Sequence, residues 1–181
     1  MNLIPRARPQ QSREQTEKIL ATHGVTTPVA LLGVRGYYRD SMGKPDVNDR
    51  GLYDDAIFLV APGKYLAFNA NTDPSTYRER IANLAPGVWQ YKVGIHGLSK
   101  PASQQYTALV QAEPVTVIRD GVGRDTGLFG INIHRGGYSG TSSLGCQTII
   151  PEQWPQFIEQ VVIALKSAGQ KVIPYCLVET A

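Results

Sequence analysis

The chain has 181 residues, of which 42% are hydrophobic and 18% charged, and its net charge is +3 at neutral pH. This length suits one domain with a sizeable core, and the composition is that of a globular rather than a disordered protein. No Lys/Arg cluster interleaved with aromatic residues marks a nucleic-acid surface, and no apolar run is long enough to span a bilayer. We therefore expect a monomeric single domain over residues 1–181 that neither binds nucleic acid nor inserts into a membrane.

The N-terminal segment lacks the continuous apolar stretch of a secretory signal. Residues 1–11 are polar and rich in Pro and Arg, which predicts a loose leader. We therefore expect synthesis in the cytoplasm without a signal peptide. A protein of this kind that acts outside the membrane needs a separate route of release.

The first part of the chain predicts a helix followed by a buried strand. Ser12 is a suitable N-cap, Gln15 stands at the capping-box position, and Gly24 would end the helix. The apolar run Thr27–Val34 predicts a buried strand. A long loop over residues 35–51, rich in Gly, Asp, Arg and Tyr, follows it, and long loops in compact domains are often functional.

The middle of the chain predicts mainly strands. Leu52–Val60 and Lys64–Ala70 predict a β-hairpin, and the turn residues after it predict a short helix over Thr76–Leu84. Further strands are expected at Val88–Gly97, Val115–Ile118 and Leu128–His134, with a turn over 120–127, and Thr148–Ile150 begins another apolar run.

The C-terminal part gives the clearest helical pattern. Apolar residues recur at helical spacing over Pro151–Gly169, and Gln170–Val178 predicts a final strand. The sum is one mainly-β domain of the α+β class, with about seven strands, two or three helices, and the long C-terminal helix packed on the sheet.

A histidine and a cysteine stand at the two ends of a Gly/Ser-rich loop that joins two apolar runs. His134 ends the first run, and Cys146, between Gly145 and Gln147, precedes the second. This arrangement predicts a thiol within hydrogen-bond reach of an imidazole, so that the thiolate can form near neutral pH. Cys146 would be the nucleophile and His134 the general base. Ser143 would orient the imidazole or the substrate, and Gly145 would let the backbone approach it.

Other residues are candidates for binding or support. Arg135 could hold a carboxylate bidentately, and His96 is either a second site histidine or a structural strand-end imidazole. Tyr37 and Arg39, in the long loop, suit contacts to a sugar or an anion. Gln147 directly follows the cysteine and is expected to support it.

Two aspartates, Asp54 and Asp55, stand where the first hairpin strand begins. Adjacent strand residues point to opposite faces, so at most one of them can serve as a general acid in a cleft. The alternative is an aspartate bonded to the backbone or to an arginine. Asp40, in the long loop, is a third carboxylate that could act on a glycan bond.

The two cysteines have different settings. Cys176 lies in the apolar run 172–178 and is expected to be a buried structural thiol, which leaves Cys146 free, although two cysteines also permit a disulfide. A zinc site built from His96, His134 and Cys146 lacks the paired-ligand spacing of known zinc motifs. We therefore expect no metal and no cofactor.

The motif around the cysteine resembles that of a known family. Ile133-His134 followed by Ser143-Leu144-Gly145-Cys146 is similar to the L,D-transpeptidase catalytic domain family, in which a histidine precedes a Ser/Thr-His-Gly-Cys box; Leu144 stands at the place of the box histidine. The resemblance covers about residues 88–150. It implies a β-rich domain that acts on peptidoglycan stem peptides through a cysteine acyl-enzyme, with Cys146 as nucleophile, His134 as base, and Ser143 and Gly145 completing the box.

The leaderless chain with Arg/Asp-rich loops looks like a phage or prophage lysis enzyme on such a fold, which would await a holin before it reaches the wall. We therefore expect a peptidoglycan-degrading hydrolase of endolysin type. The alternatives are a muramidase-type glycoside hydrolase that uses an aspartate, an L,D-transpeptidase or carboxypeptidase, and a wall-binding module without activity.

Overall fold

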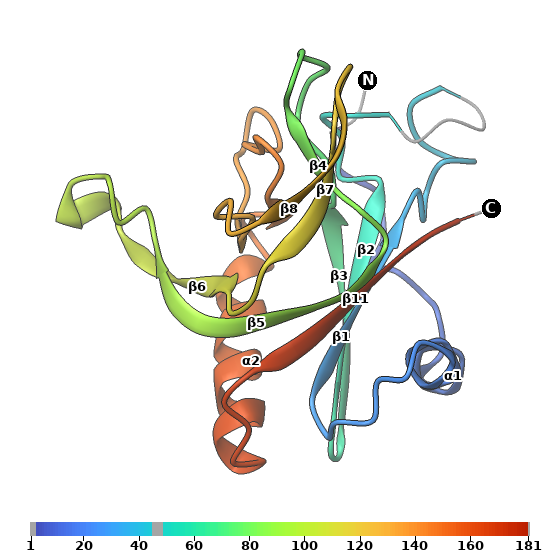
Figure 1. The fold of residues 1–181 in the computed structure, drawn as a ribbon. Coiled ribbons are helices and arrows are strands. Elements are labelled where there is room, and N and C mark those ends of the chain that lie inside the picture. Colours follow the sequence, from blue (N-terminus) through green and yellow to red (C-terminus); the bar gives the residue numbers. More distant parts are fainter. Residues whose placement is uncertain (1–2, 45–48, 181) are drawn as a thin grey trace.

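The computed structural model describes residues 3–44 and 49–180 (Figure 1). Within this part of the chain there are two α-helices, one short 3-10 helix and eleven strands. The helices are α1 (Arg13–Thr22), η1 (Ala102–Gln104) and α2 (Trp154–Ser167). The strands are β1 (Ala30–Arg35), β2 (Asp55–Ala61), β3 (Lys64–Asn71), β4 (Ala82–Leu84), β5 (Gly87–His96), β6 (Tyr106–Gln111), β7 (Val115–Arg119), β8 (Gly123–Gly127), β9 (Ile133–Arg135), β10 (Gln147–Ile149) and β11 (Ile173–Glu179).

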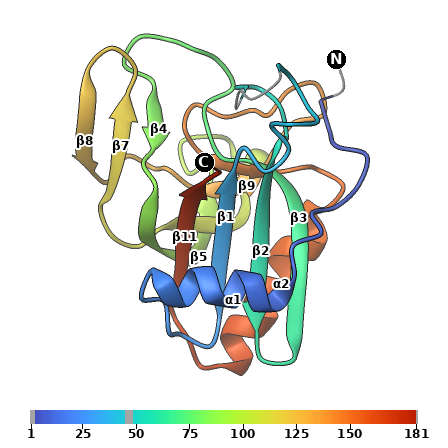
Figure 2. The same cartoon turned by 90° about the vertical axis from the view of Figure 1, so that its right-hand side faces the viewer.

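Eight of the strands close into a barrel in the order β1-β11-β5-β6-β9-β10-β3-β2. Two neighbouring pairs are parallel, β1 with β11 and β9 with β10, and the other pairs are antiparallel. The remaining strands form a separate sheet, β4-β7-β8, which extends beyond one end of the barrel (Figure 2). The helices α1 and α2 lie on opposite sides of the barrel wall that contains β1 and β2 (Figure 2).

The position of β1 between two cores explains its continuous apolar sequence. Leu31 is part of the main core, together with Phe157 and Val161 of α2. Its neighbour Leu32 points to the other face and belongs to a smaller core that includes Leu20 of α1. Because successive residues of a strand point to opposite faces, a strand that is covered on both faces has to be apolar throughout.

The expected class is confirmed, since the domain is sheet-rich with mixed α/β content and a C-terminal helix. The N-terminal helix is confirmed with its capping box, in which Ser12 and Gln15 each accept from the backbone N–H of the other. No helix in the described residues is both long and apolar enough to cross a membrane.

Three local predictions are wrong. The helix expected over 76–84 is absent, because Ala82–Leu84 pairs with β7 as a strand, and tertiary pairing overrides local propensity. The expected turn over 120–127 contains β8, which completes that sheet. The strand expected from Leu128 is shorter and begins at Ile133, because the N–H groups of Phe129 and Ile131 donate to the Gln111 side chain instead of a neighbouring strand.

The N-terminal segment is attached to the barrel, in contrast to the loose leader expected. The Leu3 carbonyl accepts from the N–H of Tyr53, and the Ala7 carbonyl accepts from the hydroxyl of Tyr38. Arg8 donates to the Ala67 carbonyl of β3 at 3.2 Å. Within the long loop, residues 45–48 lie outside the described part of the chain.

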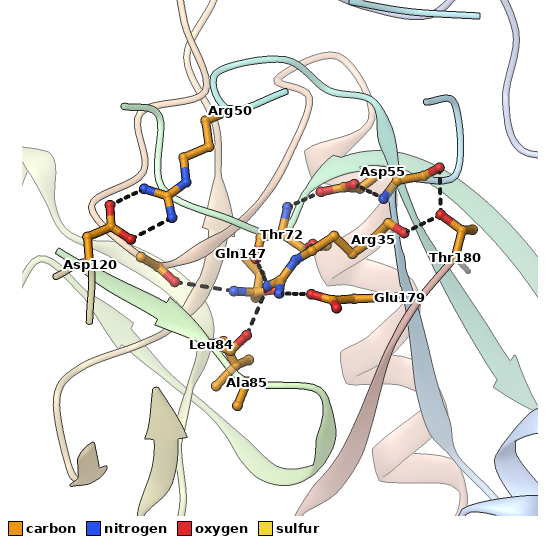
Figure 3. A network of polar contacts seen from close by, with 12 residues as sticks. Arg35, Arg50, Asp55, Thr72, Leu84, Ala85, Asp120, Gln147, Glu179 and Thr180 are labelled. Atoms are coloured by element: carbon orange, nitrogen blue, oxygen red, sulfur yellow. Dashed lines mark hydrogen bonds and ion pairs between the residues drawn. The ribbon is translucent and has the colours of Figure 1, made fainter. Parts of the chain in front are cut away.

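A buried arginine joins the barrel to the outer sheet (Figure 3). Arg35, at the end of β1, is only 3% exposed, and its guanidinium donates to the Thr72 carbonyl at 2.6 Å and to the Leu84 carbonyl at 3.0 Å. It also pairs with Glu179 of β11 at 2.8 Å. Since Leu84 belongs to β4 and Thr72 follows β3, one side chain fixes the segment between them. That segment includes Ser75, which contacts the loop between β9 and β10.

Candidate active site

A cleft of about 650 Å³ contains four of the candidate residues singled out in the sequence, His96, His134, Arg135 and Cys146. Its walls come from the end of the β5–β6 hairpin, from β9 and from the loop between β9 and β10. The lining residues are His96, Lys100, Ser103, Gln104, Tyr106, His134, Arg135, Gly136, Gly137, Tyr138, Ser142, Leu144 and Cys146.

The parallel pairing of β9 and β10 brings Cys146 and His134 to this cleft. In its register Gln147 lies opposite Ile133, and Thr148 lies opposite His134. The loop between the two strands therefore folds back and returns the cysteine, one residue before β10, beside the strand that carries the histidine. Both residues line the cleft, but among the described residues no hydrogen bond joins the Cys146 thiol to the His134 ring, so their expected hydrogen bond stays a prediction.

The surroundings of the Cys146 thiol favour its protonated form, whereas the sequence suggested that a thiolate could form near neutral pH. The Cys146 Sγ–H donates to the carbonyl of Gly130 at 3.4 Å, and Sγ accepts from the N–H of Asn132 at 3.4 Å. Burial raises the pKa of the Cys146 thiol, and the Asn132 N–H offsets only part of that rise. If this thiol acts as a nucleophile, a base has to take its proton during the attack.

His134 is held in the tautomer that such a base requires. Its Nδ1 donates to the carbonyl of Arg135 at 2.7 Å, so the lone pair is on Nε2. The ring is buried, and burial first and the nearby His96 second lower the pKa of His134 to about 4. The imidazole is consequently neutral at pH 7 and can accept a proton.

The second histidine of the cleft is in direct contact with the first. The His96 ring stacks on His134 with centroids 4.1 Å apart, and its Nδ1 accepts from the Asn132 side-chain amide at 3.2 Å. Burial and the charge of Lys100 lower the pKa of His96. His96 therefore lines the cleft beside the candidate base, and its hydrogen bond to Asn132 is also what a structural imidazole would make.

Asn132 is a site residue that the sequence reasoning missed. Its backbone N–H contacts the thiol, and its side chain contacts His96. It stands two residues before His134, and side chains two apart in an extended segment share a face. The alternation of side chains along a strand could therefore have identified Asn132 from the sequence.

The residues that flank Cys146 shape the turn rather than contact the imidazole. The Ser143 hydroxyl donates to the Cys146 carbonyl at 2.7 Å and accepts from the Gly145 N–H at 3.0 Å. Gly145 has φ +126°, and a Cβ there would lie 2.4 Å from the carbonyl oxygen of Ala82. Gln147 is buried, and its amide donates to the Gly145 carbonyl. Ser143, Gly145 and Gln147 therefore support Cys146 by fixing the conformation of the turn that carries it.

The outer part of the loop is fastened by residues that no motif indicated. Ser75 donates its N–H to the Ser143 carbonyl at 2.9 Å, accepts from the Ser143 N–H at 2.8 Å, and shares a hydrogen bond with Thr141. The Tyr53 hydroxyl donates to the Gly137 carbonyl at 2.8 Å. These contacts come from segments more than 60 residues earlier in the chain. Only the tertiary fold brings them together.

The charged groups of the cleft are cationic. Arg135 is exposed on its wall, with the guanidinium 5.3 Å from the centroid of the Tyr106 ring. Lys100 lies on the connection between β5 and β6. No Asp or Glu is among the lining residues.

The remaining candidates lie outside this cleft. Asp55 is fully buried and accepts from the N–H groups of Gly36 at 2.6 Å and Thr72 at 2.5 Å, so it is a structural carboxylate. Asp54 is also buried; burial, followed by the Asp55 and Asp73 carboxylates, raises its pKa to about 9.

The two loop residues that were expected to contact a sugar or an anion lie elsewhere too. Tyr37 packs against Phe58 and accepts from the N–H of Gln10. Arg39 donates to the carbonyl of Thr180.

The described residues contain no group of three or more His, Cys, Asp or Glu side chains that could hold a metal ion. Both cysteines are free, and Cys176 is buried as expected.

Comparisons with protein-family models, with curated proteins and with solved structures find no match. The function of the cleft therefore has to follow from its own chemistry.

Proposed function

We propose that the protein is a peptidoglycan-degrading hydrolase that cleaves an amide bond of the stem peptide, on an L,D-transpeptidase-like fold, with Cys146 as the nucleophile. The observation that carries this proposal is the shared cleft of Cys146 and His134, with the His134 tautomer held by the Arg135 carbonyl. A thiol, a neutral imidazole with a free Nε2 and a group that orients the imidazole are the parts that cysteine acyl transfer needs.

The first half of the reaction forms an acyl-enzyme. Cys146 Sγ attacks the carbonyl carbon while its proton moves to Nε2 of His134. The Gly145 N–H is already bonded to Ser143, so we assign stabilisation of the oxyanion to the N–H of Cys146. The intermediate collapses when Nε2 gives the proton to the leaving amine, and a thioester remains on Cys146.

The second half hydrolyses the thioester. His134 Nε2 takes a proton from water, the hydroxide attacks the thioester carbonyl, and the product carboxylic acid leaves as Sγ regains a proton. The low pKa of His134 keeps the imidazole neutral at pH 7, and it makes the transient imidazolium a strong acid that readily gives its proton to the leaving group. Attack by an amine in place of water would make the same acyl-enzyme serve an L,D-transpeptidase.

The burial of both aspartates outside the cleft gives no support to the muramidase alternative. A glycosidase needs two carboxyl groups that face the scissile bond, whereas Asp54 and Asp55 are at most 1% exposed. We therefore favour cleavage of a peptide bond. In this proposal the wall is reached after release from the cytoplasm, as for an endolysin.

Digestion of purified sacculi tests the proposal. Mass spectrometry of the soluble products should show new amines and carboxylates within the stem peptides, and no new reducing sugar ends. Cys146→Ala should abolish product formation, whereas Cys176→Ala, which removes the other thiol, should retain it. Full activity of Cys146→Ala, or reducing ends as the main product, would show the proposed mechanism to be wrong. New cross-links without cleavage would indicate a transpeptidase, and binding without products a wall-binding module.

A further inference from the structure

We propose that the substrate carries a free carboxylate beside the reacting carbonyl and that Lys100 and Arg135 bind this carboxylate. This inference rests on the proposed function, because stem peptides are the substrates considered, and it adds the chemical group that the cleft selects. The inference is based on the positive charge of the cleft wall. Of the thirteen lining residues two are permanent cations and none is a carboxylate.

Neither cation is neutralised within the part of the chain that the structure describes. The ion pairs found there involve Arg13, Arg35, Arg39, Arg50 and Arg119, and neither Lys100 nor Arg135 takes part in one. Two like charges at one cleft repel each other, and an anion between them would remove that repulsion.

The backbone positions of Arg135 and Lys100 are both fixed by the fold. Arg135 ends β9, and its guanidinium lies over the Tyr106 ring of β6, which limits its conformations. The backbone of Lys100 is held by two hydrogen bonds: its N–H donates to the Gly97 carbonyl at 2.8 Å, and its carbonyl accepts from the Gln105 amide at 2.9 Å. Such preorganisation reduces the entropy that binding would otherwise lose.

Both cations are close to the reacting groups. Lys100 and Arg135 line the same cleft as Cys146 and His134, and Arg135 directly follows His134 in β9. Both cations also contribute to the low pKa of His134. A carboxylate bound between the cations would therefore lie next to the thiol and the base. The planar guanidinium suits bidentate binding of a carboxylate, whereas the lysine ammonium supplies a point charge.

Two readouts with one pair of peptides test this inference. The probes are a synthetic stem peptide with free carboxylates and the same peptide with every carboxyl group converted to a carboxamide. Calorimetry on the Cys146→Ala protein measures binding without turnover, and the wild-type protein is used to measure kcat/KM. We expect the carboxylate form to bind about tenfold more tightly, as one charge-assisted contact allows.

Variants assign the preference to the two side chains. Lys100→Met and Arg135→Gln, each made in the Cys146→Ala background, should reduce the ratio of the two Kd values to below about threefold. Lys92→Met and Arg124→Gln are matched controls, since both residues are exposed and lie outside the cleft, and they should keep the wild-type ratio.

The outcomes separate this inference from the proposed function. Equal affinity for the two peptides, or a preference that survives both Lys100→Met and Arg135→Gln, overturns the carboxylate site even when both peptides are cleaved. A carboxylate preference that depends on both cations, with no cleavage of either peptide, supports the site and contradicts the hydrolase.

Discussion

His96 and His134 stack nearly face to face, with ring centroids 4.1 Å apart and an interplanar angle of 22°. They come from β5 and β9, which are not neighbours, with β6 between them in the barrel. Each imidazole covers one face of the other and excludes water from it. A proton on either ring is therefore disfavoured by burial and by the other ring, and the pair is neutral at pH 7.

Removal of His96 should raise the pKa of His134. The variant His96→Ala uncovers one face of the His134 ring and removes one of the groups that lower its pKa. We expect the NMR titration of the His134 ring to move from about 4 toward the ordinary value near 6.5. His23→Ala is the control, since His23 caps α1 away from the cleft. An unchanged His134 titration in His96→Ala would contradict the role given to the stack.

The reactivity of the thiol should rise with pH beyond neutrality. Burial raises the pKa of Cys146, so the thiolate fraction is small at pH 7 and grows as pH increases. In the Cys176→Ala protein, which has one thiol, we expect the rate of alkylation by iodoacetamide to increase continuously from pH 6 to 9. The same protein in urea should react faster at pH 8. A rate that is already at its plateau at pH 6 would indicate a resting thiolate and refute this prediction.

The buried carboxyl of Asp54 should make the protein less stable as pH rises. Its pKa in the folded state is about 9, above the unfolded value near 3.9, so the folded state holds the extra proton between these values. Stability from this group is complete below about pH 4 and is lost as pH rises toward 9. Asp55, which accepts two backbone N–H groups, is the member of the pair whose charge is stabilised.

The variant Asp54→Asn should remove this dependence. We expect the free energy of unfolding of the variant to exceed that of the wild type by a margin that grows by about 1 kcal/mol per pH unit between pH 5 and 8. Urea unfolding at several pH values measures it. Asp40→Asn, at an exposed carboxylate, is the control. A margin that does not change with pH would show that Asp54 is ionised in the folded protein.

Gly145 should be irreplaceable, in contrast to a glycine of the same loop. Gly145→Ala places a Cβ 2.4 Å from the Ala82 carbonyl at a φ of +126°, so the loop must shift, at a cost of about 1–3 kcal/mol. The shift would displace Cys146 and lower kcat. A Cβ at Gly140 meets nothing within 4 Å, so Gly140→Ala should change stability by less than about 0.5 kcal/mol. Urea unfolding and sacculus digestion of both variants check this, and equal behaviour would refute it.

Site residues could be predicted from the sequence where they are close to one another along the chain. Cys146 and His134 could be paired from sequence, because one loop joins the apolar runs that carry them, and those runs are adjacent strands in the barrel. Asn132 was within reach of the same reasoning through strand alternation. Tyr106 and Lys100 were not, since they reach the cleft only after β5 and β6 have paired in one register.

The fold shows the same division. The strand β1 and the helix α2 could be predicted from the sequence, because an apolar run and the helical spacing of apolar residues reflect burial directly. The helix expected over 76–84 was wrong because β4 depends on pairing with β7, a partner more than 30 residues away. The closure of the barrel also depends on a distant partner, because β1 and β11 pair across 144 residues.

The pairing of β1 with β11 has a consequence for the stage of folding at which the barrel can close. β1 and β11 are the first and the last strand of the described residues, yet they lie side by side, and Arg35 at the end of one binds Glu179 at the end of the other. During synthesis one edge of β1 therefore stays unpaired until β11, 144 residues later, has been made. β11 also pairs with β5, which carries His96 to the cleft. A chain interrupted before β11 would therefore lack the closed barrel and the strand that β5 pairs with.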